Sequence, residues 1–377
     1  MKILQVTAAL EQGGVERGTV EMAAFIVSQG AESLVASQGG RLVTELEAQG
    51  SRHVFLPLAK RNPAAILYSA VQLRRLILRE KISLVHARSR APAWAAYLAC
   101  RWTGVPFLTT FHGTHRIQNS VKKFYNSIMV RGRRVVAISE FIKSHILHNY
   151  AVDESLIDVA PRGYDPVVFN PESIDPQQVE QLRESLALEQ GLPVIALPGR
   201  LTRWKGQALL IEALAQFRDV PWQALFIGGA DKKTAYLEEL KSMVDLFGIS
   251  ERVHFVGDQS EIALYYLLSD LVVSASTEPE AFGRVAVEAQ AMGRPIVASA
   301  HGGSLETVVD GETGWLFKNR DAADLAKTLR KALSGADLKK IGTNGRRWVA
   351  ANYTIDRMCR AEWAAYEKVL GLQTKNE

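Results

Sequence analysis

Cysteine is scarce in this chain of 377 residues, which has only Cys100 and Cys359, far apart in sequence. Two isolated thiols do not build a disulfide framework, and their spacing does not match a zinc site. No apolar run approaches the roughly 20 residues that a membrane-spanning helix needs. The apolar run that begins at Ile3 is too short for a signal peptide and is typical of a first strand. These absences favour a cytoplasmic protein with no metal site.

Two nucleotide-binding fingerprints are also missing. No P-loop occurs, and the first glycine-rich run reads Gly13-Gly14-Val-Glu-Arg-Gly18 rather than Gly-x-Gly-x-x-Gly. This excludes P-loop chemistry and argues against a dinucleotide-dependent dehydrogenase. What remains is the composition of an ordinary globular protein, 47% hydrophobic and 23% charged, with a length that suggests two domains.

Strand-like apolar runs alternate with helical segments from end to end, which is typical of parallel sheets covered by helices on both faces. A turn-rich stretch, Pro161-Arg-Gly-Tyr-Asp-Pro166, interrupts the series, and a second series starts at Pro193. We therefore expect an α/β protein with two doubly wound, Rossmann-like domains that face a cleft and bind ligand at the carboxyl ends of their strands. The predicted parts are an N-terminal domain (1–165), a linker (166–190), a C-terminal domain (191–354) and a final helix (355–377) that packs back on the first domain. The predicted strands are 3–8, 33–37, 53–57, 84–86, 107–110, 135–138 and 157–159, then 194–197, 223–227, 253–256, 271–274, 295–298 and 314–317.

The most informative stretch is Glu280-Ala-Phe-Gly-Arg-Val-Ala-Val-Glu288, which follows the predicted strand 271–274 and leads into a small, apolar helical run. At such a junction, free backbone N–H groups and the positive end of the helix dipole provide a seat for a phosphate. Glu280 would lie on the loop and Glu288 about one turn inside the helix, so both can face one ligand. Carboxylates beside an anion seat suggest a nucleotide sugar. The alternative is a pair of solvated surface residues.

A second motif, Gly199-Arg200-Leu-Thr-Arg-Trp-Lys205-Gly206, follows the first strand of the second series and opens a helix. Arg200 can bind phosphate oxygens with two donors, and Lys205 adds a point charge. Because the helix dipole disfavours cations at an N-terminus, the motif predicts an anionic ligand, with a solvated basic loop as the alternative. Further along, Gly302-Gly303 can bring its backbone close to a ligand, and Ser304 is predicted to cap the next helix.

Candidate residues of the first domain also follow predicted strands. The pair Gly13-Gly14 lets a backbone approach a ligand, or simply makes a tight turn. His112 can hydrogen-bond a sugar hydroxyl or stabilise a developing charge, and a metal pair with His115 is disfavoured because no carboxylate or histidine cluster stands nearby. Acceptor contacts are predicted at positions where surface or capping roles are the alternative, namely Glu16, Arg17, Arg88 and Arg90.

Charge is unevenly distributed along the chain. Residues 1–165 carry 21 Lys and Arg against 12 Asp and Glu, a net charge of +9, and the remainder carries −4. Between residues 116 and 143, apolar side chains interleave with basic ones at helical spacing, and the only acid is Glu140. An ordinary amphipathic helix and a peripheral contact with an anionic membrane or acceptor are the main interpretations, and nucleic acid is the least favoured. The basic residues are Arg116, Lys122, Lys123, Arg131, Arg133, Arg134 and Lys143.

Taken together, these stretches resemble the retaining glycosyltransferases of family four, which have the GT-B architecture. The resemblance covers nearly the whole chain, and its strength lies in the order and spacing of several motifs that are weak singly. The first half, with Val85-His-Ala-Arg-Ser-Arg-Ala-Pro92, looks most like bacterial members that build lipopolysaccharide cores or similar cell-surface glycans. The motifs are Gly13-Gly14, Phe111-His-Gly113, Ala137-Ile-Ser139, Pro161-Arg-Gly-Tyr-Asp165, Gly199-Arg200 with Lys205-Gly206, Glu280-x7-Glu288, and Gly302-Gly303 to Gly314.

The resemblance implies roles for the matching positions. The donor diphosphate would be held by Gly199, Arg200 and Lys205 and approached by Gly14. The transferred sugar would be bound by Glu280, by the backbone N–H groups of Phe282 and Gly283, and by His112 near the reacting carbon. The ribose would be bound by Glu288. The catalytic set implied is His112, Arg200, Lys205 and Glu280. Tyr164 departs from the small or β-branched residues common in relatives, and we draw nothing from it.

The implied reaction moves a sugar from a nucleotide sugar, UDP-linked ahead of GDP-linked, to a glycan or lipid-linked acceptor in lipopolysaccharide or cell-surface polysaccharide synthesis. Arg200, Lys205 and the helix N-terminus at Gly283 are aimed at the leaving diphosphate, so we expect no metal and no cofactor beyond the donor itself. No convincing carboxylate nucleophile is present, which favours front-face substitution with retention. The enzyme would be cytoplasmic, with a peripheral location at the inner face of the membrane if the basic segment binds lipid.

Other functions remain open at this point. A nucleotide-sugar-binding or scaffold protein could keep the fold without turnover, although intact Arg200, Lys205, Glu280 and Glu288 argue against it. A nucleotide-sugar epimerase of the same fold would need no acceptor, and a phosphorylase would carry a lysine-bound pyridoxal phosphate. Binding of a reduced nicotinamide cofactor would favour a dehydrogenase.

Overall fold

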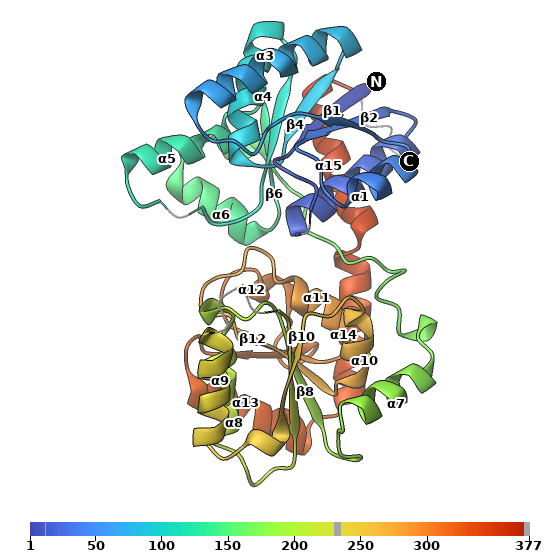
Figure 1. Ribbon diagram of the computed structural model, residues 1–377, viewed down its shortest axis with the longest axis vertical. Coiled ribbons are helices and arrows are strands. Elements are labelled where there is room, and N and C mark those ends of the chain that lie inside the picture. Colours follow the sequence, from blue (N-terminus) through green and yellow to red (C-terminus); the bar gives the residue numbers. More distant parts are fainter. Residues whose placement is uncertain (12, 116, 230–234, 373–377) are drawn as a thin grey trace. The chain divides into compact units, whose positions relative to one another are not determined.

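The computed structural model describes residues 1–11, 13–115, 117–229 and 235–372, which divide into two compact units (Figure 1). The first unit consists of Met1–Arg162 and the segment from Ile355 onward, and the second of Gly163–Thr354. Arg116 and the last residues of the predicted final helix, 373–377, lie outside the described residues. The α/β class predicted from the sequence is confirmed, because each unit is built on a parallel sheet covered by helices.

The first unit has a parallel sheet in the order β3-β2-β1-β4-β5-β6-β7. Its central strands β4 and β5 are buried along their whole length and appear in the sequence as largely apolar runs, whereas the edge strand β3 is partly exposed. The order reverses direction between β1 and β4, and this reversal defines a switch point at the carboxyl ends of the strands. The strands are β1 (Lys2–Val6), β2 (Glu32–Ser37), β3 (Arg52–Phe55), β4 (Leu84–Ala87), β5 (Phe107–Phe111), β6 (Arg134–Ala137) and β7 (Ile157–Val159).

Helices cover both faces of this sheet. α3 and α4 pack together over one face, and α1 and α15 lie together against the other (Figure 1). α15 comes from the far end of the chain, and its buried residues Met358, Tyr366 and Val369 share a core with Ile3 and Leu84 of the sheet. The final helix therefore returns to the first unit. The helices are α1 (Gly14–Ser28), α2 (Val43–Ala48), α3 (Pro63–Glu80), α4 (Arg90–Thr103), α5 (Ser120–Asn126), α6 (Glu140–Asn149) and α15 (Ile355–Leu370).

The segment predicted as one helix over 121–131 is divided. α5 begins after Asn119, whose side chain accepts a hydrogen bond from Lys122 N at 2.8 Å. From Ser127 the chain tightens into the 3₁₀ helix Ser127–Val130. Asn126, at the change of helix type, is fully buried and accepts a hydrogen bond from Arg90 at 2.9 Å.

The second unit has a parallel sheet in the order β10-β9-β8-β11-β12-β13. Alternate residues of β8 face opposite layers: Ile195 and Leu197 join the core under α8, α9 and α13, and Val194 and Ala196 join the core under α7 and α10. The strands are β8 (Val194–Pro198), β9 (Gln223–Ile227), β10 (Val253–Gly257), β11 (Leu271–Ser274), β12 (Ile296–Ser299) and β13 (Gly314–Phe317). The helices are α7 (Pro176–Ser185), α8 (Gln207–Leu214), α9 (Ala235–Leu246), α10 (Ile262–Leu268), α11 (Arg284–Ala291), α12 (Ser304–Thr307), α13 (Ala322–Gly335) and α14 (Leu338–Asn352).

The segment expected to be a linker, 166–190, packs as part of the second unit. Val179, Leu182 and Leu186 of the α7 region lie against the core formed by Leu188, Val194 and α10. The second unit accordingly starts at Gly163. α7 has the polar exposed surface that suggested a linker, but its apolar stripe is covered.

Candidate active site

The second-unit candidates lie at the switch point of the sheet, where the loops after neighbouring strands β8 and β11 meet. β8 pairs with β11 through Ile195–Leu271 and Ala196–Val272, so both loops leave the same edge. The loop after β8 carries Gly199, Arg200 and Lys205, and the loop after β11 carries Glu280. Crevices at such switch points are where doubly wound sheets bind ligands.

Gly206 fixes the distance between these two loops. Its φ of +77° lies in the left-handed region, and a Cβ at this position would lie 1.9 Å from the carbonyl oxygen of Ala275. Thr277 N also donates to Trp204 O at 2.7 Å, which ties the two loops together. The backbone around Lys205 is therefore held directly against the end of β11.

Lys205 and Glu280 form a largely buried ion pair. Lys205 Nζ donates to Glu280 Oε1 at 2.7 Å, and their side chains are 17% and 13% exposed. Ser276 Oγ donates to the same oxygen at 2.5 Å, and His301 Nε2 lies 2.7 Å from Ser276 O. Burial tends to raise the pKa of Glu280, but the Lys205 ammonium and the Ser276 hydroxyl outweigh it and hold that pKa below its usual value. Glu280 is therefore an ionised acceptor.

The loop that follows Glu280 leaves two backbone donors available. Within the described part of the chain, the N–H groups of Phe282 and Gly283 donate no hydrogen bond. Gly283 precedes α11 as its N-cap, so these donors lie at the positive end of that helix. The back of the loop is closed by Gly302, where a Cβ would lie 2.6 Å from Glu280 O, and by Gly303 N, which donates to Glu280 O at 2.9 Å.

This arrangement revises two expectations for the glycine pair. Gly302-Gly303 packs against the backbone of the Glu280 loop, and this close approach accounts for the absence of side chains there. Ser304 is not the cap that the sequence suggested: Gly303 is the N-cap of α12, without a side-chain hydrogen bond, and Ser304 is the first helical residue.

Glu288 is buried in α11, and its two oxygens have different partners. Tyr266 Oη donates to Oε2 at 2.9 Å, and Arg284 Nη2 donates to Oε1 at 2.7 Å. Burial raises the pKa of the Tyr266 hydroxyl well above its usual value, and the negative charges of Glu288 and Glu280 raise it further.

Arg200 differs from Lys205 in its surroundings. Its side chain is exposed, and it makes no ion pair with any described carboxylate. Gly199 N donates to Ile227 O at 2.8 Å, and the aliphatic part of Lys205 lies over Gly199, 3.5 Å from where a Cβ would be. The loop after β8 therefore offers Arg200 as an unpaired cation beside two paired ones, Arg203 with Glu239 and Lys205 with Glu280.

His112 and Gly14 belong to the first unit, after β5 and at the start of α1. His112 Nε2 is buried and has no hydrogen-bond partner among the described residues. Burial, with the nearby positive charges of Arg162 and Arg88, lowers the pKa of His112 well below its usual value, so its imidazole is neutral. Gly14 O accepts a hydrogen bond from Arg162 Nη2, and this guanidinium fills the space where Gly18 would carry a Cβ.

The four residues predicted to contact the acceptor differ in their burial and in their partners. Arg88 does not reach the surface: it is buried, Nη1 donates to Glu362 Oε1 of α15 at 2.8 Å, and Nε donates to Gln5 Oε1 at 2.9 Å. We therefore withdraw it as an acceptor contact. Arg17 is ion-paired with Glu45, and Arg90, which is half-buried, binds Asn126. Glu16 lies in the first turn of α1, with its carboxylate next to Gly13.

Four residues next to the site were not predicted from the sequence. Ser276 carries a weak signal, because it lies in the same loop as Glu280 and precedes it by four residues. His301 sits directly before Gly302-Gly303, and Arg284 is one turn from Glu288, a spacing at which helical side chains meet. Tyr266 is 22 residues from Glu288, and nothing in the sequence connects the two.

Some of the basic side chains between residues 116 and 143 form ion pairs that the sequence did not suggest. Lys143 pairs with Glu154 at 2.7 Å, and Arg134 pairs with Asp158, so acids from beyond residue 143 neutralise two of the seven cations. Arg116 lies outside the described residues. Lys122, Lys123, Arg131 and Arg133 make no ion pair with a described carboxylate.

In residues 1–11, 13–115, 117–229 and 235–372, no group of three or more His, Cys, Asp or Glu side chains is arranged to hold a metal ion. Across the same ranges, no helix combines the length and the apolar character needed to cross a bilayer.

Comparison with known proteins gives a consistent result for both units. A model described as Glycosyltransferase Family 4 matches residues 12–168, and one described as Glycosyl transferases group 1 matches residues 178–348. The D-inositol 3-phosphate glycosyltransferase of Jonesia denitrificans is 31% identical over 304 residues, which are 76% of this chain and 71% of that protein.

Solved structures extend the similarity to the whole fold. A glycosyltransferase from Rickettsia africae ESF-5 is 38% identical with a TM-score of 0.91, covering 100% of this chain and 99% of that one. HepE from Anabaena, in complex with UDP and glucose, is 23% identical with a TM-score of 0.83, covering 97% and 99% of the two chains, which is a similarity of fold. With two parallel-sheet units, matching family models and a relative at this identity, the chain belongs to the family-4 glycosyltransferases, which have the GT-B fold.

Proposed function

We propose that this glycosyltransferase moves a sugar from a nucleoside diphosphate sugar to a hydroxyl of a glycan or lipid-linked acceptor, with retention of anomeric configuration. The observation that supports the proposal most is the junction before α11. There, the free N–H groups of Phe282 and Gly283 and the Lys205–Glu280 ion pair belong to one small assembly of loops. Donors for phosphate oxygens and an acceptor for sugar hydroxyls are therefore available together.

The donor contacts follow from the charges. Lys205 and the exposed Arg200 bind the diphosphate, with Arg200 able to offer two donors to one phosphate. Glu280, which is ionised, accepts hydrogen bonds from hydroxyls of the transferred sugar. Glu288 accepts hydrogen bonds from the ribose, and Gly14 and His112 of the first unit are assigned to the diphosphate and the sugar. UDP is the first nucleotide to test, because HepE, which has a similar fold, is described in complex with UDP-glucose.

The chemistry needs stabilisation of the leaving group. As the bond between the anomeric carbon and the phosphate oxygen breaks, negative charge accumulates on the diphosphate. Arg200, Lys205 and the positive end of α11 stabilise this charge, and loss of one such donor costs about 3 kcal/mol, or roughly a hundredfold in rate. The proposal includes no metal ion and no cofactor other than the donor.

Retention is proposed to occur by front-face substitution. The acceptor hydroxyl attacks from the face that the diphosphate leaves, and a leaving phosphate oxygen takes the hydroxyl proton. Glu280 is held by Lys205 and Ser276, which supports a role in binding hydroxyls and not as a nucleophile. His112, whose imidazole is neutral, is assigned to hydrogen-bond the transferred sugar without adding charge.

The acceptor site is assigned to the first unit on the remaining candidates, Glu16, Arg17 and Arg90. The relative from Jonesia denitrificans is named a D-inositol 3-phosphate glycosyltransferase. For this chain we propose a sugar hydroxyl of a glycan or lipid-linked intermediate in lipopolysaccharide or cell-surface polysaccharide synthesis.

Donor binding is tested by titration calorimetry with UDP, GDP and ADP in the presence of EDTA. Lys205→Ala is compared with Arg203→Ala, a matched control from the same loop whose exposed side chain pairs with Glu239 and not with Glu280. We expect one nucleotide to bind the native protein and Arg203→Ala equally, and Lys205→Ala at least about tenfold more weakly, as for loss of a hydrogen bond to a charged group. Equal binding by both variants would contradict the assignment of Lys205.

Turnover separates the competing functions. A transferase releases nucleoside diphosphate only when an acceptor is present, and nuclear magnetic resonance of the product should show the donor's anomeric configuration. Conversion of the donor sugar without an acceptor would identify an epimerase, and tight binding without any turnover would identify a binding protein. An inverted product, or a trapped covalent adduct on Glu280, would refute the front-face mechanism.

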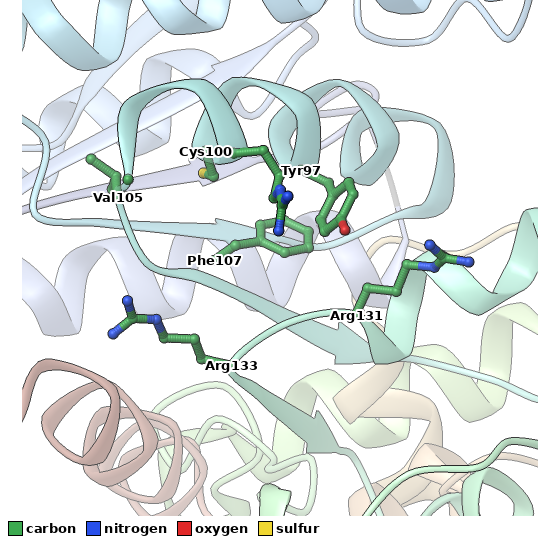
Figure 2. Close-up of a pocket in the computed structure, with 8 residues that line it drawn as sticks. Tyr97, Cys100, Val105, Phe107, Arg131 and Arg133 are labelled. Carbon is green, nitrogen blue, oxygen red and sulfur yellow. The ribbon is translucent and has the colours of Figure 1, made fainter.

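We further propose that the basic side of the first unit contacts an anionic membrane. A pocket of about 360 Å³ lies between the end of α4 and the starts of β5 and β6 (Figure 2). Its arginines face no acid in the lining, and Arg131 and Arg133 point away from one another (Figure 2). This spread suits an array of lipid phosphates better than one small ion. The lining residues are Tyr97, Cys100, Arg101, Gly104, Val105, Phe107, Arg131 and Arg133.

Exposed apolar side chains lie on the neighbouring helices. Trp102 of α4 is 45% exposed, and Val121 and Phe124 of α5 are 75% and 58% exposed. Arg131 stacks on Phe124, with 5.3 Å from its guanidinium carbon to the ring centre. Cations beside exposed apolar groups are typical of interfacial binding.

Vesicle sedimentation tests the membrane contact. We expect R101E/R133E to bind phosphatidylglycerol vesicles less than the native protein, and R74E/R75E, which makes the same charge change on α3, to bind normally. Equal binding by both double variants would show that net charge alone governs the interaction. Absence of binding by the native protein would refute the contact.

A further inference from the structure

Glu288 is held between a buried neutral donor and an exposed cation. Tyr266 of α10 is fully buried, and its hydroxyl donates to Oε2 at 2.9 Å. Arg284, one turn earlier in α11, donates to Oε1 at 2.7 Å, and its side chain is 44% exposed. The carboxylate therefore has one partner on its protein side and one on its solvent side.

Tyr266 is a fixed partner. Its ring packs edge-on against Phe169, with 6.1 Å between ring centres, and its hydroxyl has no route to water. Burial, together with the negative charge of Glu288, raises the pKa of Tyr266 well above its usual value, so the hydroxyl keeps its proton and always donates. A buried carboxylate that lost this donor would have an oxygen without its hydrogen bond.

Arg284 is an exchangeable partner. If the exposed Arg284 guanidinium leaves Glu288, water can accept its hydrogen bonds. The Tyr266 hydroxyl lies in the core, where water cannot replace Glu288 as its partner. When a ligand hydroxyl reaches the solvent side of Glu288, the geometry allows it to replace or share the contact with Arg284 while Oε2 stays on Tyr266. The orientation of the carboxylate then comes from the tyrosine.

We propose that Tyr266 is a positioning residue for ribose recognition: it sets the rotation of the Glu288 carboxylate so that Oε1 faces the ribose diol of the donor. The inference rests on the proposed function, in which Glu288 binds the ribose. Tyr266 touches neither the ligand nor the reacting atoms. Its effect should therefore appear in donor binding and in the preference for ribose over deoxyribose, and not in the chemical step.

The test compares UDP with 2′-deoxy-UDP by titration calorimetry. The native protein should prefer UDP by about tenfold or more, the size of one hydrogen bond to a charged group. Tyr266→Phe should reduce this preference by roughly threefold to tenfold and weaken UDP binding, with 2′-deoxy-UDP affected less. In turnover, the KM for the donor should rise and kcat should stay near that of the native enzyme. If a guanine or adenine nucleotide is the tighter ligand, its own ribose and deoxyribose pair is used.

Tyr265→Phe is the matched control. Tyr265 is the neighbouring residue of α10 and is also buried, but its hydroxyl donates to no described residue. It should keep the native preference, and thermal unfolding should show both variants folded. If Tyr266→Phe is folded and keeps the native preference, the proposal is overturned.

Glu288→Gln distinguishes this failure from failure of the proposed function. If Glu288→Gln loses the ribose preference while Tyr266→Phe keeps it, Glu288 binds the ribose without help from Tyr266. If Glu288→Gln also keeps the preference, the ribose assignment itself is wrong and the positioning role falls with it. A reduced preference in both variants, with normal behaviour of Tyr265→Phe, is the result we expect.

Discussion

Glu362→Gln is the sharpest test of how α15 is held in the first unit. Glu362 and Arg88 are both fully buried, with Nη1 to Oε1 at 2.8 Å. Nη2 also lies 2.8 Å from Oε2, but at ion-pair distance only, because that nitrogen is directed at Gln5. Burial alone would lower the pKa of Arg88, but the Glu362 carboxylate outweighs it and raises that pKa, so Arg88 stays charged. The substitution therefore leaves a buried cation without its counter-charge.

The expected cost is about 3–5 kcal/mol, the range for breaking one partner of a buried pair. At roughly 2–4 °C per kcal/mol for a unit of this size, the calorimetric transition of the first unit should fall by about 10 °C. Asp356→Asn is the matched control, because Asp356 pairs with Arg360 on the same helix but both side chains are more than half exposed. Its cost should stay within about 0.5 kcal/mol.

A double variant separates charge burial from packing. Replacing both partners by apolar residues, as in R88M/E362L, should recover most of the loss, because no unpaired charge remains in the core. If Glu362→Gln changes the unfolding free energy by less than about 1 kcal/mol, the pair does not anchor α15 as argued.

Three further outcomes are expected. Gly206→Ala should lower kcat/KM about a hundredfold and lower the unfolding free energy by about 2–5 kcal/mol, because its Cβ would meet Ala275 O. Gly191→Ala, where φ is +80° and the space is open, should lower the unfolding free energy by only about 1–2 kcal/mol. Urea unfolding and donor kinetics check both variants. Burial tends to raise the pKa of Glu280, but Lys205 lowers it, so the stability that Glu280 contributes should be present above pH 4.3, roughly its unfolded pKa, and be lost as the pH falls through the lower folded value. In Lys205→Met the folded pKa of Glu280 should rise toward its unfolded value, so unfolding measured from pH 6 to 3 should show a smaller acid-induced loss, or none. The two buried cysteines, whose thiol pKa values are raised by burial, should resist iodoacetamide at pH 7 until the protein unfolds, and rapid native labelling would contradict their burial.

Much of the fold could be predicted because buried parallel strands leave a strong sequence signal. Each of the predicted strands is present, with ends shifted by at most two residues. Val194–Pro198 and Leu271–Ser274, for example, are short, continuous apolar runs followed by glycine or polar loops, which is typical of buried parallel strands. The boundary between the units was harder to predict, because α7 is polar overall and its two apolar residues that pack on α10, Val179 and Leu182, give only a weak sequence signal.

The residues of the candidate site also divide into those that the local sequence marks and those that it does not. Lys205 could be singled out as a candidate because a cation at a helix start departs from the expected pattern, and Glu280 because it follows a buried strand and precedes the start of a helix. Arg88 satisfied the same rule and was misassigned, since its partner Glu362 lies 274 residues later and no local pattern marks the pair. Tyr266 was missed for the equivalent reason. Contacts made by distant segments follow from the packing of the whole unit, and short-range spacing does not contain them.

The pairing of charges in the donor site bears on which ligands it selects. Without ligand, Lys205 is neutralised by Glu280 and Arg284 by Glu288, each at 2.7 Å. A diphosphate that draws Lys205 away leaves the Glu280 carboxylate, only 13% exposed, short of a partner, and that is costly unless another donor replaces the ammonium. Sugar hydroxyls supply such donors, and a bare nucleoside diphosphate does not. In the proposed function, the ion pair between Lys205 and Glu280 therefore favours the complete nucleotide sugar over the spent nucleotide, which assists release of the product after transfer.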